Sequence, residues 1–166
     1  MTLLHKIRRL TAADAALYRD LRLEGLETTP QAFTAAYEIE SRQPLDWFAD
    51  RLSRFEVLGG ALGDGPICGV MGLAIPESPR TAHKGDVFGV YLQPHARGTG
   101  LASALLQAVI DLARGRLEAL TLGVGAYNEP AQKLYRSVGF RPVALLEREL
   151  RVGDVYYDEI LMRMDL

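Results

Sequence analysis

A glycine-rich loop near the middle of the chain has the composition of an anion-binding site. The loop, Gln93 to Ala102, contains Arg97, Gly98 and Gly100, and it follows the apolar run Val87 to Leu92. After the loop, apolar residues recur at helical spacing as Leu101, Ala104, Leu105, Ala108, Val109 and Leu112. The first N–H groups of a helix have no intrahelical partner, and the helix dipole places partial positive charge there. Because glycine lets the backbone approach a ligand closely, we predict phosphate binding at this strand–helix junction.

Two familiar phosphate-binding patterns do not fit this loop. A P-loop requires a lysine directly after its second glycine, and here Leu101 follows Gly100. The dinucleotide-binding pattern Gly-x-Gly-x-x-Gly requires a third glycine where this chain has Ser103. A tight turn with a solvated arginine is the structural alternative.

A second segment, Val124 to Phe140, places polar groups on a short helix. Asn128 is a good N-cap, Glu129 suits the positive end of a helix, and Pro130 fits its first turn. Apolar residues then form one stripe, and Gly139 ends the helix: Ala131, Leu134, Tyr135 and Val138. Asn128 and Tyr135 are about two turns apart, so they lie on one face roughly 10 Å from each other.

The two segments together resemble the GCN5-related N-acetyltransferase (GNAT) superfamily. Arg97-x-x-Gly100-x-Ala102 resembles its pyrophosphate-binding loop, Gln/Arg-x-x-Gly-x-Gly/Ala, with alanine at the last position. Asn128-x-x-Ala131-x-x-Leu134-Tyr135-x-x-x-Gly139-Phe140 resembles the motif that follows the fifth strand of that family. The resemblance implies an acetyl-CoA-dependent N-acetyltransferase.

The resemblance also implies roles for individual residues. Main-chain groups of Val90, Tyr91 and Leu92 would hold the pantetheine arm and polarise the acetyl carbonyl, and Asn128 would also bind that arm. Tyr135 would protonate the leaving thiolate, since an ordinary tyrosine keeps its proton at pH 7. The pyrophosphate would be held by the N–H groups of Arg97, Gly98, Thr99, Gly100, Leu101 and Ala102.

The general base and the acceptor amine are less explicit. Asp86 precedes the fourth apolar strand and Glu24 lies near the acceptor-side helix, so both carboxylates are candidate bases, with ordered water as the alternative. The segment from Glu24 to Trp47 is expected to shape an amine pocket by charge and cation–π contact. It contains three aromatic residues and three further acids: Phe33, Tyr37, Trp47, Glu27, Glu38 and Glu40.

The elements that must position these residues alternate along the whole chain. The pattern predicts the order β-α-α-β-β-β-α-β-α-β-β, an α/β (mixed α+β) class, and the resemblance implies a three-layer fold whose mixed sheet splays between its fourth and fifth strands. The expected strands are His5 to Leu10, Glu56 to Leu62, Ile67 to Ile75, Val87 to Leu92, Leu117 to Leu122, Arg141 to Arg151 and Val155 to Met164. Helices are expected from Thr11 toward Leu26, from Pro44 to Leu52, and in the two motif segments.

Composition limits the remaining possibilities. The 166 residues suggest one domain, 1–166, and a net charge of −2 argues against a general nucleic-acid or membrane surface. The single cysteine, Cys68, lies in an apolar run and cannot form an internal disulfide. We expect a cytoplasmic protein with no export signal and no metal site, and a homodimer is compatible with the sequence. The acceptor would be a small-molecule or peptide amine.

Two other functions remain open on the sequence. A non-catalytic acyl-CoA-binding module would use the same loop without turnover. A binder of another nucleotide phosphate would use the helix N-terminus but not Tyr135.

Overall fold

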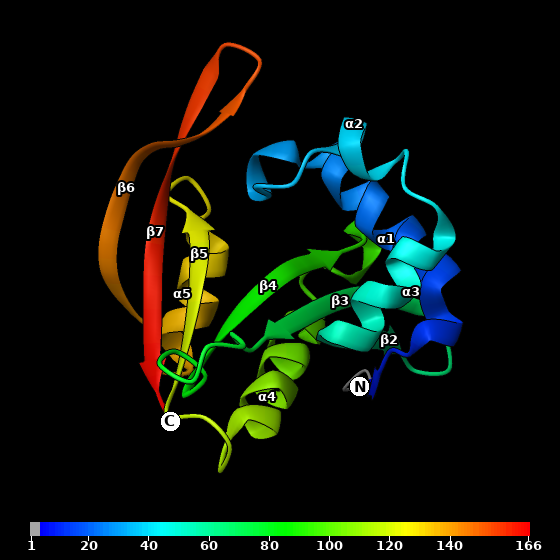
Figure 1. Cartoon of the computed structure of the whole chain (residues 1–166), viewed down its shortest axis with the longest axis horizontal. Coiled ribbons are helices and arrows are strands. Elements are labelled where there is room, and N and C mark those ends of the chain that lie inside the picture. Colours follow the sequence, from blue (N-terminus) through cyan, green and yellow to red (C-terminus); the bar gives the residue numbers. More distant parts are fainter. Residues whose placement is uncertain (1–3) are drawn as a thin grey trace.

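The computed structural model describes residues 4–166, and in these residues seven strands form one mixed sheet (Figure 1). The strand order across the sheet is β1-β2-β3-β4-β5-β7-β6. The strands are β1 (His5–Arg9), β2 (Glu56–Leu62), β3 (Ile67–Ala74), β4 (Lys84–Leu92), β5 (Ala119–Gly125), β6 (Arg141–Val152) and β7 (Val155–Asp165). The α-helices are α1 (Ala15–Thr28), α2 (Tyr37–Glu40), α3 (Leu45–Arg54), α4 (Leu101–Ala113) and α5 (Glu129–Ser137).

This order confirms the element order and fold class expected from the sequence. One addition is α2, a single helical turn between the two expected N-terminal helices. A 3-10 turn, Ala12–Asp14, leads into α1, and another, Pro94–Ala96, separates β4 from the glycine loop. Positive φ angles at Gly63 and Gly153, 57° and 59°, allow the two tight hairpin turns that join β2 to β3 and β6 to β7.

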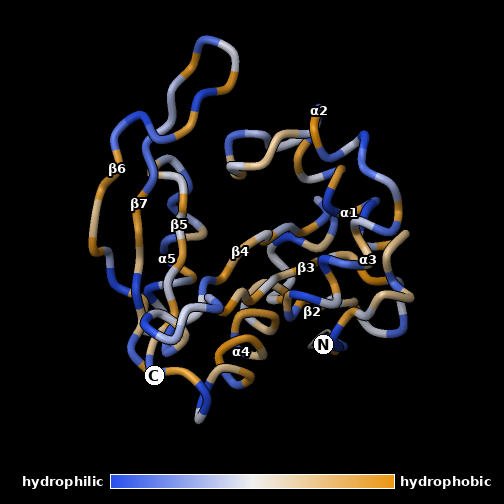
Figure 2. The backbone as a smooth tube through the Cα atoms, in the orientation of Figure 1, coloured by the Kyte–Doolittle hydropathy of each residue, from blue (hydrophilic) through white to orange (hydrophobic). Residues whose placement is uncertain are grey.

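Helices cover both faces of the sheet and divide the core into two clusters. On one face, α4 and α5 pack with the strands, and the buried side of α4 consists of Leu101, Leu105, Leu106, Val109, Ile110 and Ala113. On the other face, α1 and α3 bury Tyr18, Leu21, Phe48 and Leu52 against β2, β3 and β4. Figure 2 shows α4 as a largely hydrophobic helix beneath the strands. Burial of each Leu or Ile side chain stabilises the folded state by about 1.5–3 kcal/mol.

The sheet opens between β4 and β5. These parallel strands pair only at Lys84↔Ala119, Gly85↔Leu120 and Asp86↔Thr121, while the rest of β4 pairs with β3 alone. Beyond Asp86 the two strands therefore diverge, which confirms the expected splay (Figure 1).

A β-bulge in β4 lies just beyond the start of this opening. Val70↔Tyr91 and Gly72↔Phe88 are paired across β3 and β4, so β4 has an extra residue between these pairs. Gly89 has a φ of 60°, a conformation that favours glycine. This bulge was not predicted from the sequence, although an isolated glycine in a strand is a known signal for one.

None of the helices in residues 4–166 combines the length and the apolarity needed to cross a bilayer. Across the same described residues, no three side chains of the metal-binding types lie close enough together to hold an ion.

Candidate active site

The loop before α4 presents main-chain amide groups at the N-terminus of a long helix, although the Arg97 N–H donates to the Pro94 carbonyl at 3.2 Å and the Leu101 N–H to the Thr99 hydroxyl at 3.4 Å. Gly98 and Gly100 have φ angles of 72° and 87°, which L side chains rarely adopt. The Thr99 hydroxyl donates to the Ala96 carbonyl at 2.6 Å, and His5 Nε2 lies 2.9 Å from the Thr99 carbonyl oxygen. The first main-chain bond of α4 runs from the Ala104 N–H to the Gly100 carbonyl, which leaves the amides of the preceding turn without intrahelical acceptors. This geometry is that of an anion cradle.

The end of β4 offers main-chain groups beside the loop. The Gln93 N–H donates to the Cys68 carbonyl at 2.9 Å, so the main chain of Gln93 faces β3. Because main-chain groups point alternately to the two sides of a strand, those of Leu92 face the opening. There the Leu92 carbonyl accepts a hydrogen bond from Arg97 Nε at 3.1 Å. Tyr91 turns its side chain into the α1 and α3 face, where it is buried.

The helix α5 places Asn128 and Tyr135 as the sequence predicted. Asn128 is the N-cap of α5, and its Oδ1 accepts from the Ala131 N–H at 3.2 Å. Tyr135 is only 6% exposed and packs edge-to-face against Phe140 at a centroid distance of 5.9 Å. Burial alone raises the pKa of Tyr135 to about 12, so its hydroxyl is protonated throughout the neutral range.

One residue that tethers α5 was missed. Gln132 is buried, and its side-chain amide donates to the carbonyls of Gly125 and Ala126, each at 3.1 Å. These bonds join the middle of α5 to the end of β5, and so fix the position of the helix that carries Tyr135. A polar residue on the inner face of a short helix was the available signal.

The two predicted base candidates lie at different ends of β4. Asp86 accepts a hydrogen bond from the Thr121 hydroxyl at the point where β4 and β5 separate. Glu24 accepts from the Tyr91 hydroxyl and from Gln93 Nε2, both at 2.9 Å. From Asp86 to Tyr91 a strand rises about 16 Å, so the structure does not bring the two carboxylates together.

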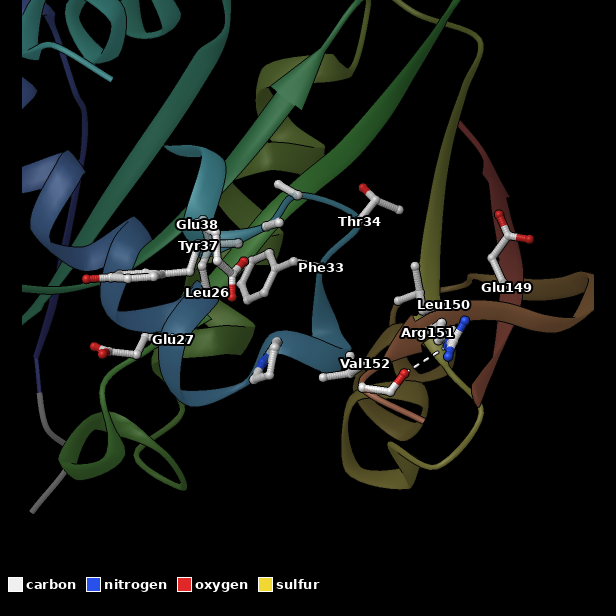
Figure 3. Close-up of a pocket in the computed structure, with 14 residues that line it drawn as sticks. Leu26, Glu27, Phe33, Thr34, Tyr37, Glu38, Glu149, Leu150, Arg151 and Val152 are labelled. Carbon is white, nitrogen blue, oxygen red and sulfur yellow. Dashed lines mark hydrogen bonds between the residues drawn. The ribbon is translucent and has the colours of Figure 1, made fainter. Parts of the chain in front are cut away.

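A pocket of about 580 Å3 lies between the α1–α2 segment and the tip of the β6–β7 hairpin (Figure 3). One wall contains Phe33 and Tyr37 together with the acids Glu27 and Glu38, as expected for an amine pocket. The opposite wall is the end of β6 and its turn, residues 149–153, where Arg151 Nε donates to the Gly153 carbonyl at 2.8 Å.

Two residues expected in this pocket lie elsewhere. Trp47 packs on Phe48 at a centroid distance of 4.9 Å and lies under the Arg51 guanidinium, so its ring contacts residues of its own helix, α3. Glu40 is buried in a bidentate ion pair with Arg22, at 2.5 Å and 2.7 Å. The expectation that Trp47 and Glu40 line the acceptor pocket is therefore wrong.

The sheet opens beside a helix N-terminus and a buried tyrosine lies on the following helix, which is the arrangement that the resemblance to the GNAT superfamily implies. A family model described as the acetyltransferase (GNAT) family matches residues 19–140. The chain belongs to this family.

Individual relatives agree with the family and the fold. The chain is 35% identical over 107 residues to N-alpha-acetyltransferase RimI of Mycobacterium tuberculosis, which is 64% of each chain. The chain spans 64% or less of the length of the curated relatives that it matches. It is also similar to the crystal structure of a GNAT-family acetyltransferase from Streptococcus pneumoniae, with a TM-score of 0.85, 26% identity, and 98% and 100% of the two chains covered. The fold is shared with YncA of Salmonella typhimurium, determined with its cofactor acetyl-CoA, at a TM-score of 0.84 and 22% identity over 98% of this chain and 94% of that one.

Proposed function

We propose that this protein is an acetyl-CoA-dependent N-acetyltransferase that acts on a primary amine by direct attack in a ternary complex. The observation that carries the proposal is the opening between β4 and β5 next to the N-terminus of α4. The opening exposes one main-chain edge of β4 to a thioester arm, and the helix N-terminus supplies amides to a pyrophosphate.

The residues present fit such a ligand. Positive φ angles at Gly98 and Gly100 turn the loop so that its amides can converge, and no protein atom lies within 4 Å of the place of a Gly98 Cβ atom. The Arg97 guanidinium carries a charge that complements phosphate. The cradle would lie within Arg97 to Ala102 and use the amides of Gly98, Thr99, Gly100 and Ala102, since those of Arg97 and Leu101 already donate within the protein. Val90 to Leu92 and Asn128 would lie along the pantetheine arm.

Tyr135 is proposed as the general acid. When the amine has attacked the acetyl carbonyl, the leaving group is a thiolate, and a group that holds its proton at neutral pH can protonate it. The high pKa of Tyr135, about 12, keeps that proton available. Its location on α5, next to β5, places it on the face of the sheet opposite α1 and α3.

The acceptor is proposed to be a small-molecule or peptide amine held in the pocket between α2 and β6. Glu27, Glu38 and Glu149 line this pocket, and carboxylates attract an ammonium group. The aromatic rings of Phe33 and Tyr37 add an apolar surface beside them. The one guanidinium among the lining residues, that of Arg151, is already bonded to the Gly153 carbonyl and to Asp154. A cationic acceptor therefore fits the pocket better than an anionic one.

The proposal is tested by incubating the protein with acetyl-CoA and a panel of amines, and measuring free thiol. We expect thiol release that depends on one class of amine. Stabilisation by CoA without thiol release would instead identify an acyl-CoA-binding module. If ATP or NAD raised the melting temperature and CoA did not, another nucleotide ligand would be indicated.

We further propose that residues 1–166 act as one domain. The cradle and Tyr135 share the core cluster beneath α4, and both sides of the opening belong to one continuous sheet. Residues 1–3 of this span lie outside the part that the structure describes.

A further inference from the structure

The side chain of Glu159 crosses from β7 onto β5. Glu159 is paired with Gly125, but its carboxylate leans toward Gly123, where its Cδ lies 2.6 Å from the position that a Cβ atom of Gly123 would take. Only a residue without a side chain leaves this space free. The carboxylate thus lies over the strand that borders the opening of the sheet.

The carboxylate lies on the acceptor side of the opening. Asp86 and Thr121 are paired and joined by a hydrogen bond, so their side chains share one face. Gly123 is the next residue of β5 on that face, as Phe88 is on β4. Phe88 contacts Phe55 at 5.2 Å within the α1 and α3 cluster, so this is the face opposite α5 and Tyr135.

The position of Gly123 along β5 matches that of the bulge on β4. The last residue pair that β4 and β5 share before they diverge is Asp86↔Thr121. Gly123 on one strand and Phe88, followed by Gly89, on the other are therefore the first residues of this face on either side of the opening. The Glu159 carboxylate lies beside the start of the opening, opposite the irregular part of β4.

Glu159 has the surroundings of a group that accepts a proton. It is partly buried, and within residues 4–166 no cation or hydrogen-bond donor of the protein is paired with its carboxylate. Burial raises the pKa of Glu159, and the negative charge of Glu149 on β6 raises it further. Tyr127, from the loop before α5, and Tyr157 of β7 are the neighbouring titratable groups beside Gly125 and Glu159, and neither brings a positive charge.

We propose that Glu159 is the general base that takes the proton from the acceptor amine. The assignment rests on the proposed acetyltransferase function and names a residue that the sequence motifs do not contain. Asp86 is already bound by Thr121, and Glu24 is bound by Tyr91 and Gln93. The Glu159 carboxylate is free to bind an ammonium group.

The proton transfers balance across the opening. Glu159 accepts one proton from the ammonium group and passes it to solvent, which matters because an amine with a pKa of about 10.4 is neutral only about once in a thousand molecules at pH 7. The amine nitrogen then bonds to the acetyl carbon and loses its second proton to Glu159, which passes this proton to solvent as well. The carbon–sulfur bond breaks, the thiolate takes the proton of Tyr135, and Tyr135 regains a proton from solvent. One proton is released for each acetyl group transferred.

Two variants test this assignment by independent routes. Glu159→Gln removes the base but keeps the shape of the side chain. Gly123→Ala leaves Glu159 in place, but the new Cβ atom would overlap its carboxylate and push this flexible end away. Glu147→Gln, an exposed carboxylate of the same hairpin, is the matched control.

We expect Glu159→Gln to lower kcat about 100-fold or more at pH 7. In the wild type, kcat/KM should fall as the pH drops through the pKa of Glu159, because the base becomes protonated. In the variant, this fall of kcat/KM at the pKa of Glu159 should be absent. Its kcat/KM should instead rise steadily with pH until the amine itself is deprotonated. Gly123→Ala should lower kcat by a smaller factor, and the acetyl-CoA Kd of both variants should match that of the wild type. Glu147→Gln should retain full activity.

The outcomes separate this assignment from the proposed function. If the wild type acetylates an amine and Glu159→Gln stays within threefold of its kcat with the same pH profile, Glu159 is not the base and the function stands. If the wild type releases no thiol with any amine, the function fails and the assignment fails with it. Loss of folding does not explain a lower kcat when the variant binds acetyl-CoA normally. A melting temperature at pH 7 equal to or above that of the wild type is expected, since removing a carboxylate with a raised pKa relieves an unfavourable ionisation.

Discussion

Arg22 of α1 and Glu40 of α2 form a buried, bidentate ion pair beneath the bulge of β4. Both side chains are 7% exposed, and Arg22 Nη1 lies 3.3 Å from the position of a Cβ atom on Gly89. The pair therefore joins α2, whose Tyr37 and Glu38 line the acceptor pocket, to α1, which lies beside the bulge. It also explains why Glu40, which the sequence suggested as a pocket residue, is unavailable to an amine.

Removing one partner of this pair should be costly. Glu40→Ala leaves the Arg22 guanidinium buried without its counter-charge, which we expect to lower the free energy of unfolding by about 3–5 kcal/mol. The double variant Arg22→Met with Glu40→Leu should recover most of that loss. Urea unfolding of the two variants measures both values, and a loss of less than about 1 kcal/mol in the single variant would show that the pair has no structural role.

Tyr135→Phe tests the general acid. The variant keeps the ring contact with Phe140 but lacks the hydroxyl proton, so kcat should fall by about 100-fold or more, with the acetyl-CoA Kd unchanged. Tyr156→Phe, at an exposed position of β7, is the control and should leave kcat as it is. Steady-state thiol release across an acetyl-CoA titration provides both numbers. Wild-type kcat in Tyr135→Phe would remove Tyr135 from the mechanism.

The cradle can be tested with two glycines of similar conformation. Gly100 has a φ of 87° at the N-cap of α4, and Gly115 has a φ of 76° in the loop after that helix. Alanine at either position costs about 1–2 kcal/mol of backbone strain, so strain alone should lower the stability of the two variants by similar amounts. Only Gly100→Ala should weaken acetyl-CoA binding, because its Cβ atom would also press on the His5 ring at 3.2 Å and displace the loop. Isothermal titration calorimetry measures the Kd of each variant for acetyl-CoA. Equal Kd values for the two variants would contradict the proposal that the loop binds the pyrophosphate.

Asp14 should give the stability a defined dependence on pH. The hydrogen bond from Arg8 is the main cause that lowers the pKa of Asp14 from 3.8 to about 2, and the Thr11 N–H adds a further bond. A lowered pKa contributes stability above pH 3.8, and this contribution is lost as the pH falls through about 2. We expect Asp14→Asn to lower the free energy of unfolding by about 1 kcal/mol at pH 7. The effect is no larger because Arg8 is half-exposed and solvent screens its charge. Thermal unfolding should show the two proteins converging toward pH 2, and a gap that stays constant with pH would refute the ion pair.

Local sequence signals predicted the parts of this molecule that depend on short-range chemistry. The glycine loop before α4, the Asn128 cap and the end of α5 at Gly139 each follow from turn and capping preferences. The order of strands and helices follows from periodicity, which also predicted the extent of the β2–β3 and β6–β7 hairpins.

Two of the features that were missed depend on pairing between distant segments, whereas the bonds of Gln132 reach only six and seven residues back along the chain. The bulge at Gly89 exists because of its register with β3. Glu159 reaches its place only because β7 lies beside β5 and Gly123 has no side chain. No short window of sequence around Gly89 or Glu159 contains its partner.

We propose that an amine and a CoA thioester react in the opening between β4 and β5. The most direct measurement is the stoichiometry of products when the wild-type protein, acetyl-CoA and a cationic amine are incubated together, with mass spectrometry of the amine and colorimetric detection of the thiol. We expect one acetylated amine for each free thiol, and little thiol when the amine is omitted. Tight binding of acetyl-CoA with no acetylated amine from the panel would contradict it.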